Sequence, residues 1–281
     1  MTSPVRLKEQ RNCPVQALAG LLLKIYRMPG LFDWTNLLKG CRDLLFPPRC
    51  LICNEFIIEV QARSRSVFKR PDICLNCWKG FIPLPPAHCS RCGQPFQTDL
   101  PSVHTCANCL KKVPAFDQAL AAGLFQGTLR SAIHEFKYRL RMELVHSLAD
   151  FMTRGLNPPF YPPEADLILP VPLHWRRLKE RGFNQALLLA NTLFSPWKDR
   201  VRYNLLARVR WTEPQIKFKG QERQRNVLRA FAVSRPENIL DKSVILVDDV
   251  FTTGATANEC ARVLKKAGAR YVLVLTLARV A

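Results

Sequence analysis

Two neighbouring carboxylates and a hydroxyl-rich turn lie close together in the last part of the sequence. Asp248 and Asp249 directly follow the apolar run Val244–Val247, which is typical of a strand in a parallel sheet covered on both faces. The segment Thr252–Thr256 comes next, and helical periodicity begins near Ala257. Backbone N–H groups at the start of such a helix bind phosphate. The carboxylates would repel phosphate unless they held hydroxyl groups or a metal ion, so a sugar phosphate chelated by Mg²⁺ satisfies both parts of the motif.

This arrangement resembles the phosphoribosyl pyrophosphate (PRPP) signature of type I phosphoribosyltransferases. The resemblance covers residues 244–256. It implies that Asp248 and Asp249 hold the ribose hydroxyl groups of PRPP. It also implies a loop that wraps the 5′-phosphate, consisting of Thr252, Thr253, Gly254, Ala255 and Thr256. The alternative without a ligand is a strand that ends in solvated acids before a capped helix.

A second group of cations follows another expected strand end, between Pro170 and Gln185. Two prolines turn the chain there, and a glycine precedes the next helix. In type I phosphoribosyltransferases the corresponding loop binds pyrophosphate, so the resemblance implies that this group is the ligand here. The expected pyrophosphate ligands are Arg176, Arg177, Lys179 and Arg181, and Arg181 is expected to join Asp248 and Asp249 in catalysis. The alternative is a solvated basic face.

A third basic stretch, Gln215–Phe231, has no firm periodicity before Val227. We interpret it as a flexible hood that closes over PRPP and excludes water, with Arg223, Arg225 and Asn226 at its working end. The alternative is a solvated basic loop.

Eight of the 11 cysteines form four Cys-x-x-Cys pairs. The pairs are Cys50/Cys53, Cys74/Cys77, Cys89/Cys92 and Cys106/Cys109. Such spacing is typical of zinc ribbons, in which two pairs complete a tetrahedral site. Four thiolates leave no open position on the metal, so we expect two structural Zn²⁺ sites. The spacing allows either consecutive or crossed pairing.

The neighbours of these pairs bear on the same interpretation. Disulfides would need an oxidising compartment, whereas a PRPP site favours the cytoplasm, so we expect zinc and a cytoplasmic protein. His88 and His104 adjoin cysteine pairs, but four pairs already complete two sites, and we expect both to be spectators. Trp78, Phe81 and Phe96 are expected to form a small apolar floor for the ribbons. The three cysteines outside the pairs are expected to be free thiols in packed positions; they are Cys13, Cys41 and Cys260.

The composition is that of a soluble globular protein with a strong excess of positive charge. The 281 residues carry a formal net charge of +20. The segment from Pro170 to Arg235 contains 15 Lys and Arg against 4 Asp and Glu. Such a balance favours phosphate-rich partners, whether nucleotides, nucleic acid or anionic lipid.

Composition shifts divide the chain into an N-terminal extension (1–45), partly helical, a double zinc ribbon (46–113) and an α/β domain (114–281). In the extension, the apolar stretch Val15–Leu23 is too short to span a bilayer. We interpret it as a surface amphipathic helix, or as an extension upstream of a start at Met28, rather than as a secretion signal. Leu31–Phe46 shows helical spacing, and Ala62–Arg70 is typical of an exposed loop.

Strand and helix patterns alternate after Pro114, which indicates a doubly wound parallel sheet with ligands at the carboxyl ends of its strands. The expected strands are Ala119–Phe125, Asp166–Leu169, Val244–Val247 and Tyr271–Leu277. The expected helices are Thr128–Phe136, capped by Thr128, then Met142–Phe151 and Gln185–Leu193, and residues 158–163 form a proline-rich loop. The fold class is therefore α/β: a type I phosphoribosyltransferase-like domain preceded by a small double zinc ribbon.

The order of all these motifs resembles the ComF (ComFC/GntX) family. The matching features are Phe46-Pro-Pro-Arg-Cys, the four cysteine pairs, Phe136-Lys-Tyr, Pro170-Val-Pro-Leu-His, Arg-Gly-Phe-Asn-Gln185, Arg223-Gln-Arg-Asn226 and the PRPP motif. The resemblance implies a role in natural transformation, in handling incoming single-stranded DNA, or in the use of DNA as a nutrient. The first forty or so residues and the basic segment Ile216–Gly220 depart from the family pattern.

Two classes of function follow. In the first, Mg²⁺ and PRPP lie across the strand ends and the phosphoribosyl group is transferred to an acceptor that no stretch of sequence identifies. In the second, the PRPP site is a non-catalytic sensor, and the ribbons and basic surface bind single-stranded DNA or competence and uptake proteins. Trp175, Trp211 and Phe218 lie among basic residues, where they would stack on bases or pack in the core.

Overall fold

The computed structural model describes residues 47–57, 72–98, 103–156, 165–213 and 220–281. The expectations for Val15–Leu23, Leu31–Phe46, Ala62–Arg70, residues 158–163, Cys13, Cys41 and Phe218 lie outside these ranges. The chain from Pro48 to Ala281 forms one compact unit. Within the described ranges, no helix has the length and apolar character needed to cross a membrane.

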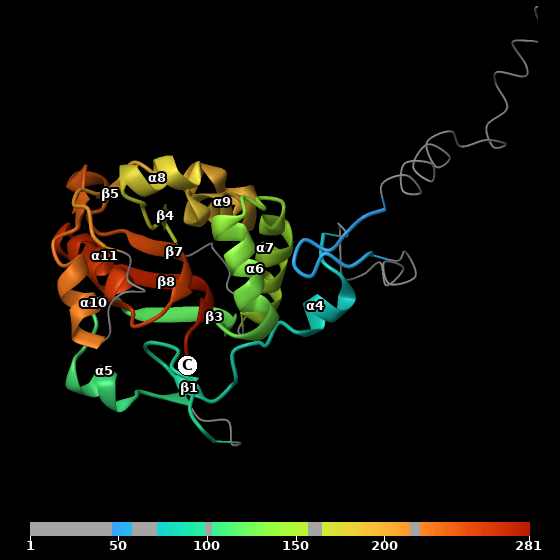
Figure 1. The fold of residues 1–281 in the computed structure, drawn as a ribbon. Helices are drawn as coiled ribbons and strands as arrows, with labels where there is room; N and C mark the ends of the chain where they lie inside the picture. Colours follow the sequence, from blue (N-terminus) through green and yellow to red (C-terminus); the bar gives the residue numbers. More distant parts are fainter. Residues whose placement is uncertain (1–46, 58–71, 99–102, 157–164, 214–219) are drawn as a thin grey trace, which may run out of the picture. The chain divides into compact units, whose positions relative to one another are not determined.

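The centre of this unit is a four-stranded, fully parallel sheet (Figure 1). Its strand order is β3 (Gln118–Leu124), β8 (Tyr271–Arg279), β7 (Ser243–Phe251), β4 (Leu167–Pro170). The expected strands agree with these to within a few residues. The parallel α/β sheet that the sequence predicts is therefore confirmed.

Helices cover both faces of the sheet, which explains the all-apolar central strands. Ile245 and Val247 belong to the core under α6 (Gly127–Tyr138), α7 (Leu144–Gly155) and α9 (Gln185–Leu193). Val244 and Leu246 belong to the core under α11 (Ala255–Lys266). Figure 1 shows these two helical layers on either side of the sheet. Successive residues of β7 therefore point to opposite layers.

The remaining elements flank this core. They are α4 (Leu75–Lys79), β1 (His88–Cys89), β2 (Val103–His104), α5 (Ala107–Lys111), α8 (Trp175–Arg181), the 3-10 helices Ser195–Arg200 and Pro236–Asn238, β5 (Leu206–Arg208), α10 (Gly220–Val227) and β6 (Phe231–Val233). β5 and β6 form an antiparallel pair that packs in the same core as α11.

Two local expectations were wrong. Thr128 does not cap α6, because the helix already begins at Gly127, where φ is 50°, and its N-cap is Gln126. The helix expected to begin near Ala257 is confirmed, since α11 begins at Ala255. The basic stretch expected to be a loop up to Val227 contains the helix α10.

Candidate functional site

The turn between β7 and α11 requires a glycine at position 254. Gly254 has φ 74°, a backbone conformation that disfavours side chains, and an added Cβ would lie 2.5 Å from the ring of Phe251. As the N-cap of α11, Gly254 has no side chain to accept hydrogen bonds from the first-turn N–H groups. An external anion is the partner that such amides suit. Thr253 is exposed at this turn, and Thr252 and Thr256 are partly buried.

The two predicted acids lie within β7 rather than after it. β4 pairs with β7 only as far as Pro170 and Val247, whereas the pairing of β7 with β8 continues to Phe251. Asp248 and Asp249 therefore occupy a part of the strand whose other side has lost its neighbour. This is the carboxyl edge of the sheet, where ligands bind in open α/β folds.

Strand alternation sends these two acids toward different layers. Asp249 faces the layer of α6, where its carboxylate lies 2.8 Å from the ammonium group of Lys137. Asp248 faces the layer of α11 and β5, where the charge of Arg208 acts on it and where its own charge helps to raise the pKa of the buried Cys260 thiol. The N–H of Asp249 donates to the carboxylate of Asp248 at 2.9 Å. The structure thus brings the acids together along the chain but gives each its own surroundings.

Asp248 is a perturbed carboxyl group. Burial and the neighbouring charge of Asp249 raise its pKa to about 7, although the Asp249 N–H and the charges of Lys137 and Arg208 act in the opposite direction. A carboxyl group with a pKa this far from its ordinary value is typical of a functional site.

Helix α8 carries the predicted pyrophosphate ligands. His174 caps it by accepting from the N–H of Arg176 at 3.3 Å, and Gly182 ends it with φ 73°. Arg177 points inward and donates to the backbone oxygen of Thr212 at 3.4 Å. Arg208, from β5, donates to the hydroxyl group of Thr212. Two guanidinium groups therefore converge on one residue near the strand ends.

The other cations of α8 have different surroundings. Arg181 donates to Gln185 Oε1 at 3.2 Å and to the hydroxyl oxygen of Tyr138 at 3.5 Å. Its guanidinium carbon lies 5.1 Å from the centre of the Tyr138 ring. Tyr138 directly follows Lys137 in α6. Arg176 and Lys179 are exposed. Arg177 and Arg181 are thus tied to the strand-end region, whereas the side chain of Lys179 faces solvent.

The expected hood residues lie on α10, which packs against α11. Asn226 donates through its amide to the backbone oxygen of Glu213 at 2.9 Å. Arg210 binds the backbone oxygens of Asn226 and Leu228 at 2.8 and 2.7 Å. Arg225 is exposed. This end of the stretch is held in place by hydrogen bonds, which does not suit a freely moving flap.

The eight paired cysteines form two tetrads whose sulfur atoms lie within 4.8 Å of one another. The tetrads are Cys50/Cys53/Cys74/Cys77 and Cys89/Cys92/Cys106/Cys109. The pairing is therefore consecutive, which the spacing alone left open. Four converging sulfurs and no open position fit a structural Zn²⁺ site.

The surroundings of each tetrad favour a metal. In the second, the N–H groups of Cys92 and Cys106 donate to the sulfur of Cys89 at 3.5 and 3.3 Å. Although burial raises the pKa of Cys89, these backbone hydrogen bonds bring it down to about 7. The pKa of Cys50, the equivalent residue of the first tetrad, is likewise about 7. Backbone donors thus stabilise one thiolate in each tetrad, whereas burial raises the pKa of Cys77 and of Cys109.

The histidines and aromatics near the tetrads behave partly as expected. His88 and His104 belong to neither tetrad. His104 stacks on Phe96 with ring centres 4.1 Å apart, and the ring of Trp78 contacts Phe81 and also Phe151 of α7. The apolar floor of the first tetrad is therefore shared with the α/β domain. Cys260 is a buried free thiol, as expected.

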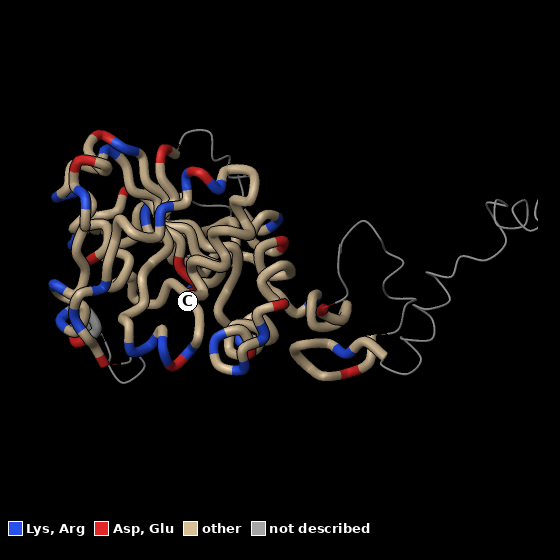
Figure 2. Tube along the Cα trace, turned by 90° about the horizontal axis from the view of Figure 1, so that it is seen from above, with Lys and Arg blue, Asp and Glu red and all other residues tan. Residues whose placement is uncertain are grey.

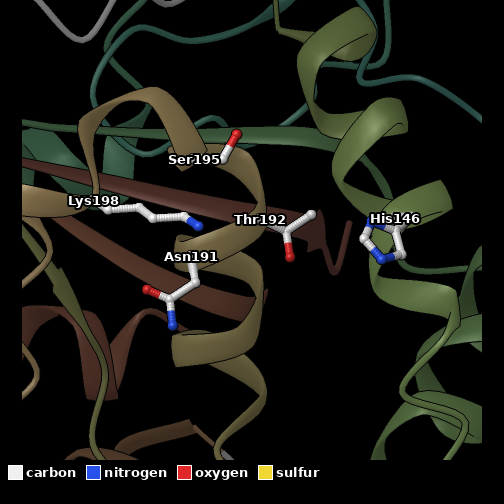
Figure 3. A pocket seen from close by; sticks show the side chains of 5 residues that line it. All are labelled: His146, Asn191, Thr192, Ser195 and Lys198. Carbon is white, nitrogen blue, oxygen red and sulfur yellow. The ribbon is translucent and has the colours of Figure 1, made fainter.

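A surface hollow lies away from this site. It is lined by His146 of α7 and by residues of α9 and the following 3-10 helix, namely Asn191, Thr192, Ser195 and Lys198 (Figure 3). The Thr192 hydroxyl group is already bonded to the backbone oxygen of Leu188 at 2.9 Å. None of the predicted site residues lines it.

Sequence reasoning missed Lys137, Tyr138 and Arg208 as site residues. Lys137 and Tyr138 belong to the Phe-Lys-Tyr motif at the end of α6, which was the only signal available for them. Arg208 lies on a short edge strand without a motif.

Comparisons with known proteins agree with this architecture. Residues 41–110 match the family described as the double zinc ribbon domain. Competence protein F of Haemophilus influenzae is 32% identical over 227 residues, which cover 78% of this chain and 96% of that protein. The chain belongs to the ComF family. The DNA utilization protein YhgH of Escherichia coli K12 is 31% identical over 226 residues, covering 72% of this chain and 96% of that protein.

Two further similarities complete the comparison. Competence protein ComFC of Bacillus subtilis is 30% identical over 243 residues, covering 82% of this chain and 94% of that protein. A solved structure titled as the allosteric regulatory enzyme of purine biosynthesis covers 51% of this chain and 30% of that chain, with 18% identity and a TM-score of 0.33. A TM-score this low does not by itself establish a shared fold. The double zinc ribbon before a parallel α/β domain, expected for a ComF protein, is confirmed by the family match and by the sheet and tetrads described above.

Proposed function

We propose that this ComF protein binds PRPP with Mg²⁺ at the carboxyl edge of β4 and β7. The proposal depends on one observation: Asp248 and Asp249 lie only a few residues before the glycine turn at Gly254. Carboxylates that can accept hydrogen bonds from ribose hydroxyl groups are thereby placed next to a helix start that can bind a phosphate. The proposal also agrees with the PRPP signature in the sequence.

Each group in this site has a role in the proposal. The amides and hydroxyls of residues 252–256 hold the 5′-phosphate, and Asp249 accepts hydrogen bonds from a ribose hydroxyl group. Lys137, 2.8 Å from Asp249, offsets the repulsion between that carboxylate and an anionic ligand. Arg177 and Arg181 face the pyrophosphate. Mg²⁺, bound with PRPP, would neutralise further charge on the phosphates.

The same arrangement suits phosphoribosyl transfer. In that reaction the bond from C1 of the ribose to pyrophosphate breaks, and an acceptor forms a new bond to C1. The protein's contribution would be positioning and the stabilisation of charge on the leaving pyrophosphate. We propose that this chemistry takes place in the cytoplasm and contributes to DNA uptake or DNA utilisation. The relatives are named as a competence protein and as a DNA utilization protein.

The test is calorimetric titration of zinc-loaded protein with PRPP and Mg²⁺. Asp249→Asn should weaken binding by about 10- to 100-fold, because a hydrogen bond to a charged acceptor contributes about 1.5–3 kcal/mol. Asp166→Asn is the matched control, since Asp166 adjoins the opposite, amino end of β4. Equal affinities in all three proteins, or no binding by folded wild type, would contradict the proposal.

A second activity, binding of single-stranded DNA, is favoured by Trp175. Its side chain is 62% exposed at the start of α8, and the Arg176 guanidinium lies 5.4 Å from its ring centre. An exposed ring beside a cation is a stacking platform for bases. In Figure 2, Lys and Arg positions lie around the whole α/β domain with Asp and Glu among them, so charge alone does not mark a track for DNA.

Trp175→Ala tests this second activity. It should weaken single-stranded DNA binding by about 1–3 kcal/mol and leave PRPP affinity unchanged. Tyr203→Ala is the control, because Tyr203 is an aromatic side chain that is 68% exposed elsewhere. If both variants bind DNA as the wild type does, α8 is not the platform.

A further inference from the structure

Arg279, the last residue of β8, carries a buried guanidinium group between the second cysteine tetrad and the turn at residues 252–256, which we call the phosphate turn. Its Nη2 atom lies 3.7 Å from the sulfur of Cys92 and donates to Gln94 Oε1 at 2.7 Å. Its central carbon lies 4.6 Å from the centre of the Phe251 ring. The side chain is only 5% exposed.

This guanidinium group lacks an ordinary counter-ion. Among the described residues no Asp or Glu forms an ion pair with Arg279, and its Nε and Nη1 atoms are buried without a hydrogen-bond partner. An unpaired buried cation is strongly destabilising. Four thiolates around Zn²⁺ carry a net negative charge, so a metal-loaded tetrad supplies the missing partner.

The same side chain fixes the residue from which the phosphate turn starts. Arg279 and Phe251 are paired across β8 and β7, and the N–H of Val280 donates to the backbone oxygen of Phe251 at 3.0 Å. The Phe251 ring also contacts Phe116 edge to face at 5.8 Å. Because this ring occupies the space beside Gly254, its position determines the shape of the turn.

The tetrad is itself joined to the sheet. The backbone oxygen of Arg91, inside the Cys89/Cys92 knuckle, accepts from the N–H of Ala119 in β3 at 2.8 Å. The knuckle therefore cannot move away from Arg279 without breaking a bond to β3. A continuous path of contacts leads from the metal ligands to the turn.

We propose that Arg279 is a positioning residue that couples the second zinc centre to the phosphate turn. The negative metal centre holds the guanidinium group, the guanidinium group holds the Phe251 ring, and the ring sets the turn at Gly254. Loss of the second zinc centre, but not of the first, then loosens residues 251–257. The ligand of the turn rests on the proposed function, whereas the coupling does not.

The first test is the release of zinc to a chelator from the full chain. Arg279→Gln should weaken zinc binding at one site only, by about 10- to 100-fold, as expected when a partner of a metal ligand is removed. Arg279→Lys, which keeps the charge, should restore part of the affinity. Arg270→Gln, a change of an exposed arginine just before β8, should have no effect. Unchanged release in Arg279→Gln, or equal acceleration at both sites, would overturn the proposal.

The second test is amide hydrogen exchange at residues 251–257, which needs no ligand. Exchange there should be faster in Arg279→Gln and in Cys92→Ser, and unchanged in Cys53→Ser, which disrupts the first tetrad. Equal exchange in Cys92→Ser and Cys53→Ser would overturn the coupling, including in the case that Arg279→Gln does not fold. PRPP titration of the same proteins distinguishes the coupling from the proposed function. If exchange is faster in Arg279→Gln and Cys92→Ser but the wild type does not bind PRPP, the proposed ligand is refuted and the coupling is supported.

Discussion

The ammonium group of Lys137 lies 2.8 Å from a carboxylate oxygen of Asp249, and the two side chains are only 17% and 14% exposed. The pair joins the end of α6 to the free edge of β7. It is the contact by which the Phe-Lys-Tyr motif reaches the predicted PRPP site. Because the pair is largely buried, removal of one partner leaves an unpaired charge out of water and lowers the free energy of unfolding.

Lys137→Met should therefore lower the free energy of unfolding by about 3 kcal/mol, the cost of breaking a largely buried pair. It should also weaken PRPP binding, since the Asp249 carboxylate, without its partner, would then repel the ligand. Denaturant unfolding of zinc-loaded protein measures the first effect. Lys242→Met is the matched control: its pair with Asp166 is longer, 3.8 Å, and exposed, so a change within about 0.5 kcal/mol is expected. Similar losses in both variants would contradict this account.

Asp248 should make the stability of the protein depend on pH. A carboxyl group whose pKa is higher in the folded than in the unfolded chain binds its proton more tightly when folded. Its contribution to stability is therefore present in acid and is lost as the pH rises through about 7. Asp248→Asn removes this loss.

The gain in unfolding free energy from Asp248→Asn should thus be larger at pH 8 than at pH 5, by on the order of 2 kcal/mol. Denaturant titrations of wild type and variant at both pH values provide the measurement. Zinc binding changes with pH in both proteins alike. The comparison therefore uses the difference in unfolding free energy between variant and wild type at each pH. A difference that is the same at pH 5 and pH 8 would show that Asp248 is an ordinary carboxyl group.

Gly254→Ala should disturb the phosphate turn because of its positive φ and because the added Cβ would clash with Phe251. Gly182 has a positive φ without such a clash, so Gly182→Ala measures the first effect alone. Gly254 and Gly182 both have positive φ, 74° and 73°, but an added Cβ meets the Phe251 ring at 2.5 Å only at Gly254. Gly182→Ala should cost about 1 kcal/mol, from the backbone conformation alone. Gly254→Ala should cost more, by about 1–3 kcal/mol, and should reduce PRPP affinity. Thermal unfolding and calorimetry compare the two; equal costs would mean that Phe251 yields easily.

Removal of zinc should unfold the two ribbons and leave the sheet intact. A structural zinc site contributes on the order of 10 kcal/mol to the fold of a small domain. With a strong chelator and a reductant, trypsin should therefore cleave after Lys79, at the end of α4, and after Arg91, inside the Cys89/Cys92 knuckle. Lys137, in α6, should stay protected. Unaltered cleavage on zinc removal would indicate that the tetrads fold without metal.

The sequence predicts the features of the site that are encoded locally. The apolar run and glycine turn identify β7 and α11, and the cysteine spacing identifies the tetrads. The extent of β7 was underestimated, because polar residues were assumed to follow the strand. Asp248 and Asp249 lie in it because β8 continues to pair with β7 up to Phe251.

Contacts between distant segments could not be predicted. Nothing in the spacing of Lys137 and Asp249 indicates that they meet, since the contact depends on how α6 packs against the sheet. Arg279 likewise stands in an apolar strand next to the C-terminus, and only the tertiary structure places it beside Cys92. The spacing of the Cys-x-x-Cys pairs allowed both consecutive and crossed pairing, and only the structure shows that consecutive pairs form each tetrad.

The most direct test of the central claim is the location of the PRPP phosphates in a crystal structure of zinc-loaded protein with Mg²⁺ and PRPP. The account predicts density for the 5′-phosphate at the amides of residues 253–256 and for the ribose hydroxyls beside Asp249. Density for PRPP at another place, or an empty turn at a concentration that saturates binding in solution, would contradict it.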